Sequence, residues 1–415
     1  MSLTYYVLAA GVSALIAFVF SFVILKLSFR FRLYPKIRDR DVHTRPTPRL
    51  GGVAMFMGIL AAFWVASQLA QFDLIFDDPR QVIAILVAAL IIVLIGVADD
   101  IWDLDWVTKL AGQMIAAGVL VWQGVQLTTL PIGGIIIVPP TLGLILTVVA
   151  VVLVMNAVNF IDGLDGLVAG VVLIANGVFF IYSYLLATSI GQSEFFNLAS
   201  LISAVLSGAC VGFLPFNWHP AKMFMGDAGA LLVGLLMAAS AISVTGTIDP
   251  EQMTSGRLLA PALLPILLPL AVLVVPLLDF ALAVTRRLRA GKSPFSADRL
   301  HLHHRLLDMG HSHLHAVLIL YAWTTVVSVG FLLFLFLPPI WAVTVIFFGL
   351  VVCSAVTLAP LTRRKALESA AQLAPPGDLV EGTERFDGLD VAANSLPDDP
   401  AHTDHPVSLA RKDAP

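Results

Sequence analysis

Long apolar segments recur along almost the whole of this 415-residue chain. A helix that crosses a bilayer needs about 20 mostly apolar residues, because the hydrocarbon core is about 30 Å thick. We find eleven such segments, at about residues 4–27, 51–71, 81–98, 109–126, 141–158, 166–187, 196–215, 227–245, 258–285, 315–336 and 340–360. This pattern predicts an all-α, polytopic membrane protein with about eleven transmembrane helices.

The composition agrees with a membrane-embedded chain. Hydrophobic residues make up 58% of it and charged residues only 13%, whereas soluble domains carry roughly 25% charged residues. The two cysteines lie in apolar segments and indicate neither a disulfide framework nor a Cys-rich metal site. The first apolar segment is too long for a signal-peptide core, so we expect it to be retained as a span. The segment 258–285 is overlong and contains four prolines, so we expect a kink or a short extra segment there.

Basic residues predict the orientation of the spans. Lys and Arg concentrate in residues 28–50, in residues 286–314 and directly after the last apolar segment. Eleven spans place these three regions on one side, which the positive-inside rule assigns to the cytoplasm. We therefore expect the N-terminus outside and the C-terminus in the cytoplasm. Residues 1–365 form the predicted transmembrane domain, and the composition of residues 366–415 predicts a disordered cytoplasmic tail.

Two adjacent acids, Asp99 and Asp100, end the third apolar segment in the sequence "ADDIWDLD". They can simply terminate a helix, but anions are disfavoured at a helix C-terminus. Adjacent carboxylates also repel each other unless a cation lies nearby. Lys109 is the nearest internal cation, and it can offset the acids, hold a phosphate or anchor the helix at the membrane surface. The acids therefore indicate a functional site at this end of the span.

A second polar run, "NAVNFIDGLDG", ends the fifth segment. Asn156, Asn159 and Asp162 recur every three residues and would form one stripe on a helix. Polar side chains at membrane depth are costly and are functional by default. The alternative is a capped helix end with an Asx turn.

The stretch "PAKMFMGDAG" precedes the eighth segment and contains Asp227. Aspartate at this position can cap the following helix. It can equally bind a hard cation such as Mg²⁺, which prefers oxygen ligands. The helix N-terminus beside it would favour a phosphate. Both a capping role and a metal-binding role remain open for this residue.

A basic run, "DRLHLHHRL", occupies residues 298–306. Its side chains can hold phosphates through charge-assisted hydrogen bonds, although contact with anionic lipid headgroups is an alternative. A zinc site made of histidine alone lacks support from any cysteine. With "DVHTRPTPRLGG" at residues 41–52, five polar stretches face the predicted cytoplasm. They indicate one site built by several loops, with the chemistry of a metal-dependent membrane phosphotransferase.

The motifs "ADDIWDL", "NAVNFIDGLDGL", "PAKMFMGDAG" and "HLHHRLL", in this order, resemble those of the polyprenyl-phosphate N-acetylhexosamine-1-phosphate transferases, or glycosyltransferase family 4. The resemblance covers about residues 1–360. It implies a multi-pass protein of the bacterial plasma membrane with a cytoplasmic active site. Members move a sugar-1-phosphate from a UDP-sugar to a polyprenyl phosphate and release UMP. The implied cofactor is Mg²⁺, with Mn²⁺ as an alternative.

The resemblance also implies roles for the acidic residues. Asp99 and Asp100 resemble the paired acids near the lipid phosphate, which are often proposed as a catalytic base. Asp227 resembles the metal-binding aspartate, and Asn159 resembles an asparagine that joins it in some members. Lys109 matches a lysine near the diphosphate.

The remaining implied contacts are with the nucleotide and the sugar. Asp162 and Asp165 match positions near the nucleotide, and Asp165 and Phe224 are the expected uracil contacts. The basic run resembles a loop that closes over the sugar and diphosphate. Its expected substrate-binding residues are Arg299, His301, His303, His304 and Arg305.

The sequences "DDIWDL" and "HLHHRLL" resemble the branch that uses UDP-GlcNAc to start a cell-envelope glycan such as O-antigen, teichoic acid or a cell-wall linker. The implied reaction transfers GlcNAc-1-phosphate to undecaprenyl or decaprenyl phosphate. The alternatives are a phospho-MurNAc-pentapeptide transferase of peptidoglycan synthesis and, from another class, a secondary transporter. We expect the protein to interact with the membrane, with UDP-GlcNAc and with the polyprenyl phosphate. We expect no nucleic-acid partner, and we leave open that the protein forms a homodimer.

Overall fold

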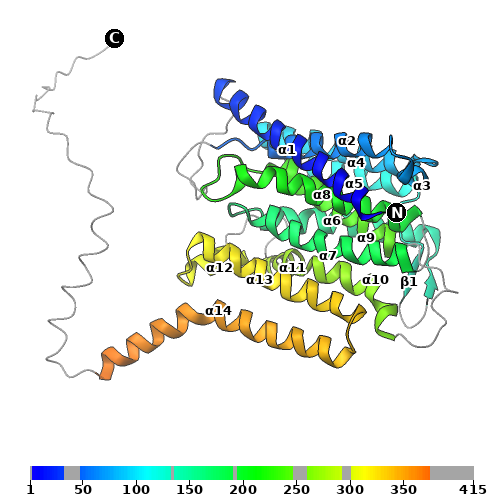
Figure 1. Cartoon of the computed structure of the whole chain (residues 1–415). Coiled ribbons are helices and arrows are strands. Elements are labelled where there is room, and N and C mark those ends of the chain that lie inside the picture. Colours follow the sequence, from blue (N-terminus) through cyan, green and yellow to red (C-terminus); the bar gives the residue numbers. More distant parts are fainter. Residues whose placement is uncertain are drawn as a thin grey trace, which may run out of the picture. The chain divides into compact units, whose positions relative to one another are not determined.

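A computed structural model describes residues 2–31, 47–131, 135–189, 194–245, 259–291 and 301–373, which are almost entirely helical (Figure 1). The helices are α1 (Leu3–Phe31), α2 (Gly51–Ala66), α3 (Asp73–Phe76), α4 (Arg80–Trp102), α5 (Trp106–Trp122), α6 (Pro140–Ile161), α7 (Leu167–Ser189), α8 (Glu194–Asn217), α9 (Gly226–Thr245), α10 (Leu259–Val272), α11 (Val274–Arg289), α12 (Leu302–Asp308), α13 (His313–Leu332) and α14 (Pro339–Leu373), with short 3-10 helices η1 (Ala70–Phe72) and η3 (Leu333–Leu335).

The chain forms two compact units, Met1–Pro360 and Leu361–Pro415. The candidate site described below lies in the first unit. Helix α14 continues to Leu373, past the predicted tail boundary at residue 365. The rest of the predicted tail, residues 374–415, lies outside the described residues.

Eight helices of the described chain are long and apolar enough to span a membrane: α1, α4, α6, α7, α8, α9, α13 and α14. Helix α2 and the segment Ala70–Phe76 qualify as a ninth only as a pair, and they are bent by 96°. Helix α5 is apolar but has only 17 residues. These findings confirm a nearly all-helical chain with many candidate spans, but they do not confirm the predicted count of eleven or the orientation.

The overlong ninth segment is broken, as its prolines predict. Helix α10 ends at Val272 and α11 begins at Val274. Pro276 lacks the N–H that would bond to the carbonyl of Val272, and its ring disfavours a continuous helix. Each half is therefore shorter than a full span.

A small antiparallel hairpin, which the sequence interpretation did not anticipate, joins α5 to α6. Its strands are β1 (Thr129–Pro131) and β2 (Ile135–Ile137), with Leu130 opposite Ile136. Figure 1 shows the hairpin and α3 at one end of the helices and α12 at the other. We call the latter the α12 end, because the candidate site lies there.

Helix α9 occupies the centre of the first unit. Nearly all of its residues are buried, and it packs against α2, α4, α6 and α8. Glycines permit the closest approaches: a Cβ on Gly52 would lie 2.2 Å from the backbone N of Gly229, and one on Gly96 would lie 2.2 Å from Cα of Ala228. The backbones of α2 and α4 are therefore in direct contact with the backbone of the first turn of α9.

The substitution Gly96→Ala should lower the melting temperature of the detergent-solubilised protein. Its Cβ would collide with the backbone of Ala228, and overpacking costs about 1–3 kcal/mol. That cost exceeds the gain of roughly 1 kcal/mol in helix propensity. Gly118→Ala on α5 is the matched control, since a Cβ there meets nothing within 4 Å. Equal melting temperatures for the two variants would argue against this close packing.

Candidate active site

The segment before α2 is hydrogen-bonded to the segment before α9. The backbone N–H of Phe224 donates to the carbonyl of Pro48 at 2.8 Å, and that of Gly51 donates to the carbonyl of Phe224 at 3.1 Å. Gly52 donates to the carbonyl of Met225 at 2.9 Å. These bonds fix the half-buried Phe224, the predicted uracil contact, beside the start of α9.

Asp100 reaches from the end of α4 to the start of α9. Its carboxylate accepts hydrogen bonds from the backbone N–H groups of Asp227, at 3.3 Å, and Ala228, at 3.5 Å. These N–H groups have no partner within the helix. Asp100 therefore caps α9 from another helix, and the capping role considered for the Asp227 side chain is already filled.

The two later acids of the run have local roles. Asp103 adopts a left-handed conformation with φ of 55° and ends α4, so the helix does not continue through the acidic run. Asp105 caps α5 by accepting hydrogen bonds from the backbone N–H groups of Val107, at 3.0 Å, and Thr108, at 3.1 Å.

Asp99, Lys109 and Asp227 form the charged centre of the site. The Lys109 Nζ atom lies 2.5 Å from Oδ2 of Asp99 and 3.2 Å from Oδ2 of Asp227. Asp99 also accepts a hydrogen bond from the backbone N–H of Leu104 at 2.8 Å. The side-chain amide of Asn159 hydrogen-bonds to Asp227. The structure thus brings together four predicted site residues from α4, α5, α6 and α9.

The oxygen donors of this centre suit a hard cation. No group of three or more His, Cys, Asp or Glu side chains in the described ranges is arranged to hold a metal ion. Mg²⁺, however, is commonly held by one or two carboxylates together with substrate phosphates and waters. The carboxylate of Asp227 and the amide of Asn159 are such donors. The ammonium group between Asp99 and Asp227 shows that a cation is accommodated there.

Asp162 follows the last turn of α6 and lies near the same charges. The pKa of Asp162 is raised to about 7, mainly by burial and in smaller part by the negative charges of Asp227 and Asp165. The positive charge of Arg49 opposes this shift. Asp162 is therefore partly protonated near neutral pH and belongs electrostatically to the Asp227 centre.

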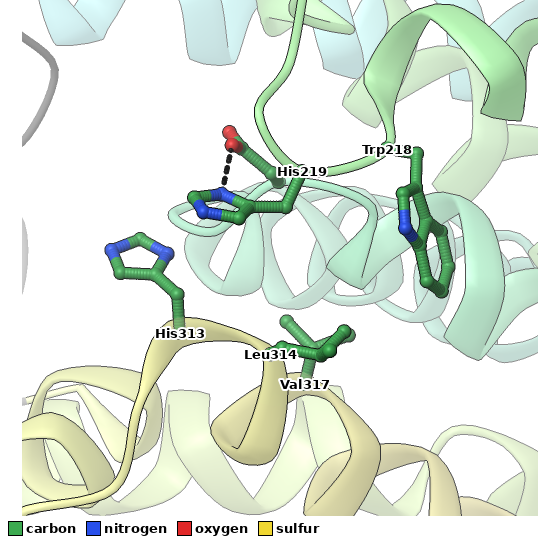
Figure 2. A pocket seen from close by; sticks show the side chains of 6 residues that line it. Trp218, His219, His313, Leu314 and Val317 are labelled. Carbon is green, nitrogen blue, oxygen red and sulfur yellow. Dashed lines mark hydrogen bonds and ion pairs between the residues drawn. The ribbon is translucent and has the colours of Figure 1, made fainter.

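Asp165 lies in a second polar group, beside the pocket shown in Figure 2. Its Oδ2 atom lies 2.8 Å from Nδ1 of His219 and accepts a hydrogen bond from the backbone N–H of Ala221 at 3.0 Å. The His219 ring stacks on His313 with centroids 5.2 Å apart. Trp218, Leu314 and Val317 complete the lining of the pocket.

The histidine run lies against the glycine turn that follows α6. A Cβ on Gly163 would lie 2.2 Å from Nε2 of His303, so the two segments are in direct contact. Burial lowers the pKa of His303 to about 3, with His304 as the second cause. His303 is therefore a neutral hydrogen-bonding group at physiological pH. His304 packs on His303 with ring centroids 4.3 Å apart.

The other predicted polar residues are placed differently. Arg305 is exposed on α12, and Arg299 lies outside the described residues. Asn156 does not join Asn159 at the site: its amide donates to Oε1 of Gln113 at 2.5 Å and to the carbonyl of Val152 at 2.8 Å. The helical stripe predicted from the sequence therefore serves helix packing at one end and the site at the other.

The sequence of this chain is similar to the sequences of known proteins. Residues 82–245 match the sequence model of glycosyl transferase family 4. A decaprenyl-phosphate N-acetylglucosaminephosphotransferase from Mycobacterium tuberculosis (strain ATCC 25618 / H37Rv) is 45% identical over 335 residues, which cover 80% of this chain and 82% of that protein. The chain belongs to glycosyl transferase family 4.

Two further relatives are less similar to this chain. A probable undecaprenyl-phosphate N-acetylglucosaminyl 1-phosphate transferase from Bacillus subtilis (strain 168) is 32% identical over 324 residues, covering 76% of this chain and 81% of that protein. A phospho-N-acetylmuramoyl-pentapeptide-transferase from Mycobacteroides abscessus is 30% identical over 302 residues, covering 64% of this chain and 83% of that protein. The expected family is thereby confirmed.

Three residues near the site of this family 4 transferase were not singled out from the sequence. Arg49 acts electrostatically on Asp100 and Asp162. His219 contacts Asp165, and Asp279 contacts the histidine run. Arg49 was obscured by the many other basic residues of its loop. Asp279 did carry a signal, because an isolated acid in an apolar segment is functional by default.

Proposed function

We propose that this chain transfers GlcNAc-1-phosphate from UDP-GlcNAc to a polyprenyl phosphate, producing polyprenyl-diphosphate-GlcNAc and UMP. The names of its mycobacterial relatives favour decaprenyl phosphate as the acceptor. The observation that carries the chemistry is the meeting of Asp99, Lys109 and Asp227 from three helices at the α12 end. Phosphoryl transfer depends mainly on positioning and charge neutralisation, which such a cluster provides.

The reaction forms one P–O bond and breaks another. An oxygen of the lipid phosphate attacks the β-phosphorus of UDP-GlcNAc, and the oxygen that bridges to the α-phosphate leaves with UMP. A phosphate monoester with a second pKa of about 6 is mostly ionised at neutral pH, so a strong base is not required. Asp99, paired with Lys109, can accept a residual proton. Asp100 supports the reaction by holding the first turn of α9.

Asp227 and Asn159 are the residues that would hold Mg²⁺. When bound, the ion neutralises negative charge on the diphosphate. Lys109 supplies a positive charge at the same place, and the histidine run supplies hydrogen-bonding groups for the sugar and diphosphate. Phe224 and Asp165 remain the proposed contacts of the uracil ring.

The choice of sugar separates this function from its nearest alternative. Purified protein should use UDP-GlcNAc at least about tenfold better than UDP-MurNAc-pentapeptide, since a preference of that size needs only about 1.4 kcal/mol. Release of UMP in the presence and absence of polyprenyl phosphate measures both specificity and lipid dependence. A preference for the pentapeptide substrate would assign the chain to the peptidoglycan branch instead.

The same assay tests the transporter alternative. Transporter sites lie near the bilayer midplane, often on broken helices, whereas Asp99 and Asp227 lie at helix ends. A transporter would release no UMP. UMP formation that requires the lipid phosphate therefore decides between the two classes.

We also propose eleven spans, with the α12 end in the cytoplasm and the N-terminus outside. This count treats α2, α5 and the broken pair α10–α11 as spans. In intact cells, a membrane-impermeant maleimide should label a Gln71→Cys variant and should not label an Asp308→Cys variant. Both positions are exposed, and the native Cys210 and Cys353 are buried. The opposite labelling pattern would place the site away from cytosolic UDP-sugars.

A further inference from the structure

Helix α11 carries an acid, Asp279, that the mechanism above does not use. Its side chain has no exposed surface. Burying a carboxylate is costly unless hydrogen bonds and charge partners compensate for lost solvation. The position of Asp279 therefore requires an explanation from its partners.

Both carboxylate oxygens of Asp279 bind the start of the histidine run. Oδ2 lies 2.8 Å from Nδ1 of His301, and Oδ1 accepts a hydrogen bond from the backbone N–H of Leu302 at 2.8 Å. An ionised carboxylate only accepts hydrogen bonds. Nδ1 of His301 must therefore carry the proton that it donates, and Nε2 is the ring nitrogen left for another partner.

The neighbours of His301 place its ring beside the active site. The ring meets Phe160 edge to face, with centroids 5.6 Å apart, and lies parallel to His303 at 5.8 Å. His303 in turn contacts Gly163. Phe160 directly follows Asn159, the proposed metal ligand, in α6. His301 is thus held against the end of the helix that supplies the site.

We propose that Asp279 is a positioning residue for phosphoryl transfer: its hydrogen bond to Nδ1 fixes the tautomer and orientation of His301, so that Nε2 is left to accept a hydrogen bond from a sugar hydroxyl of the UDP-sugar. This inference rests on the function proposed above. A carboxylate behind a histidine sets which nitrogen is free to act on a substrate. Asp279 would act only through His301 and touch no substrate atom.

A purely structural role is the competing explanation. Asp279 could serve only to hold the first residue of α12 through Leu302. Asp279→Asn separates the two roles. An asparagine oxygen can still accept from Leu302, but its NH₂ group would face His301 and donate to Nδ1. The ring would then carry its proton on Nε2, the other tautomer.

The first measurement is ¹⁵N NMR of histidine-labelled protein, with the His301 signals assigned by their loss in a His301→Gln variant. We expect wild-type His301 to carry its proton on Nδ1 and Asp279→Asn to move it to Nε2. Adding UDP-GlcNAc with Mg²⁺ to the wild-type enzyme should shift the Nε2 signal. This last measurement needs no variant, so it remains decisive if Asp279→Asn does not fold.

The second measurement is kinetic. Asp279→Asn should lower kcat by about a hundredfold or more, as expected when a catalytic histidine takes the wrong tautomer, and leave the KM for polyprenyl phosphate nearly unchanged. In a His301→Gln background the same substitution should cost less than about threefold, because residues that act through one another are not additive. Asp308→Asn, an exposed change on α12, is the control and should keep wild-type activity.

Several outcomes would overturn the proposal. These are a wild-type His301 protonated on Nε2, no Nε2 shift at saturating UDP-GlcNAc, full activity in folded Asp279→Asn, or an undiminished loss in the His301→Gln background. Failure of the proposed function looks different: wild-type enzyme would then form no UMP from UDP-GlcNAc, whatever the tautomer of His301.

Discussion

Asp227→Asn should reduce turnover of UDP-GlcNAc by on the order of a thousandfold, since metal-assisted charge stabilisation is worth several kcal/mol and each 1.36 kcal/mol is tenfold in rate. The substitution removes the charge at the proposed Mg²⁺ site and keeps the size of the side chain. It should not weaken α9, because Asp100 supplies the acceptors for the first N–H groups of that helix. Remaining activity should require higher Mg²⁺ concentrations.

A Mg²⁺ titration of turnover, with melting of the solubilised protein as the folding check, measures this effect. Asp99→Asn and Asp100→Asn are companion variants, and both should lower turnover with little change in the Mg²⁺ requirement. Asp77→Asn, an exposed change at the opposite end of the helices, should behave as wild type. Near-normal activity in Asp227→Asn at unchanged Mg²⁺ dependence would refute the metal assignment.

Lys109→Met should cause the second large loss, both of activity and of stability. The ammonium group lies between two carboxylates, at 2.5 Å and 3.2 Å. Without it, Asp99 and Asp227 repel each other in a partly buried place, and breaking such an arrangement costs about 3 kcal/mol or more when it is well buried. We expect turnover to fall by roughly two powers of ten, which corresponds to about 2.7 kcal/mol of lost transition-state stabilisation.

The stability of this variant should depend on Mg²⁺. In EDTA its melting temperature should fall about 1–2 °C below that of the wild type, because a loss of roughly 1–2 kcal/mol is divided by an unfolding entropy of about 2.1 cal/mol/K per residue. Added Mg²⁺ should restore much of the difference, because a divalent cation replaces the missing charge. Lys26→Met, on the exposed face of α1, is the control. A melting temperature insensitive to Mg²⁺ would show that the ion does not bind at Asp227.

The sequence indicated which charged residues would lie close together better than how they would be arranged. Asp99, Lys109 and Asp227 could be chosen because charged groups at span ends require a reason. The different roles of Asp99 and Asp100 could not be predicted. Consecutive residues point about 100° apart on a helix, so one acid meets Lys109 and the other meets α9. That division depends on where α4 faces, which only the packed structure determines.

Spans were predicted well where a single apolar run forms one helix. The limits of α4 and α6 agree with their segments to within a few residues. The count became uncertain where helices are short or broken, as at Pro276 between α10 and α11. Hydropathy is averaged over a window of residues. It therefore does not reveal that a single proline removes one backbone N–H donor and breaks the helix. The hairpin β1–β2 was missed because its strands have only three residues each.

The first turn of α9 is held by contacts from two helices made much earlier in the chain. Gly52 and Gly96 touch its backbone, and Asp100 binds its N–H groups. During synthesis, α2 and α4 are therefore made more than a hundred residues before their partner α9 exists. Asp100 lacks its hydrogen-bond partners until α9 has been made. Assembly of the site is thus a late event in biogenesis, and nascent chains that stop before α9 should be inserted but inactive.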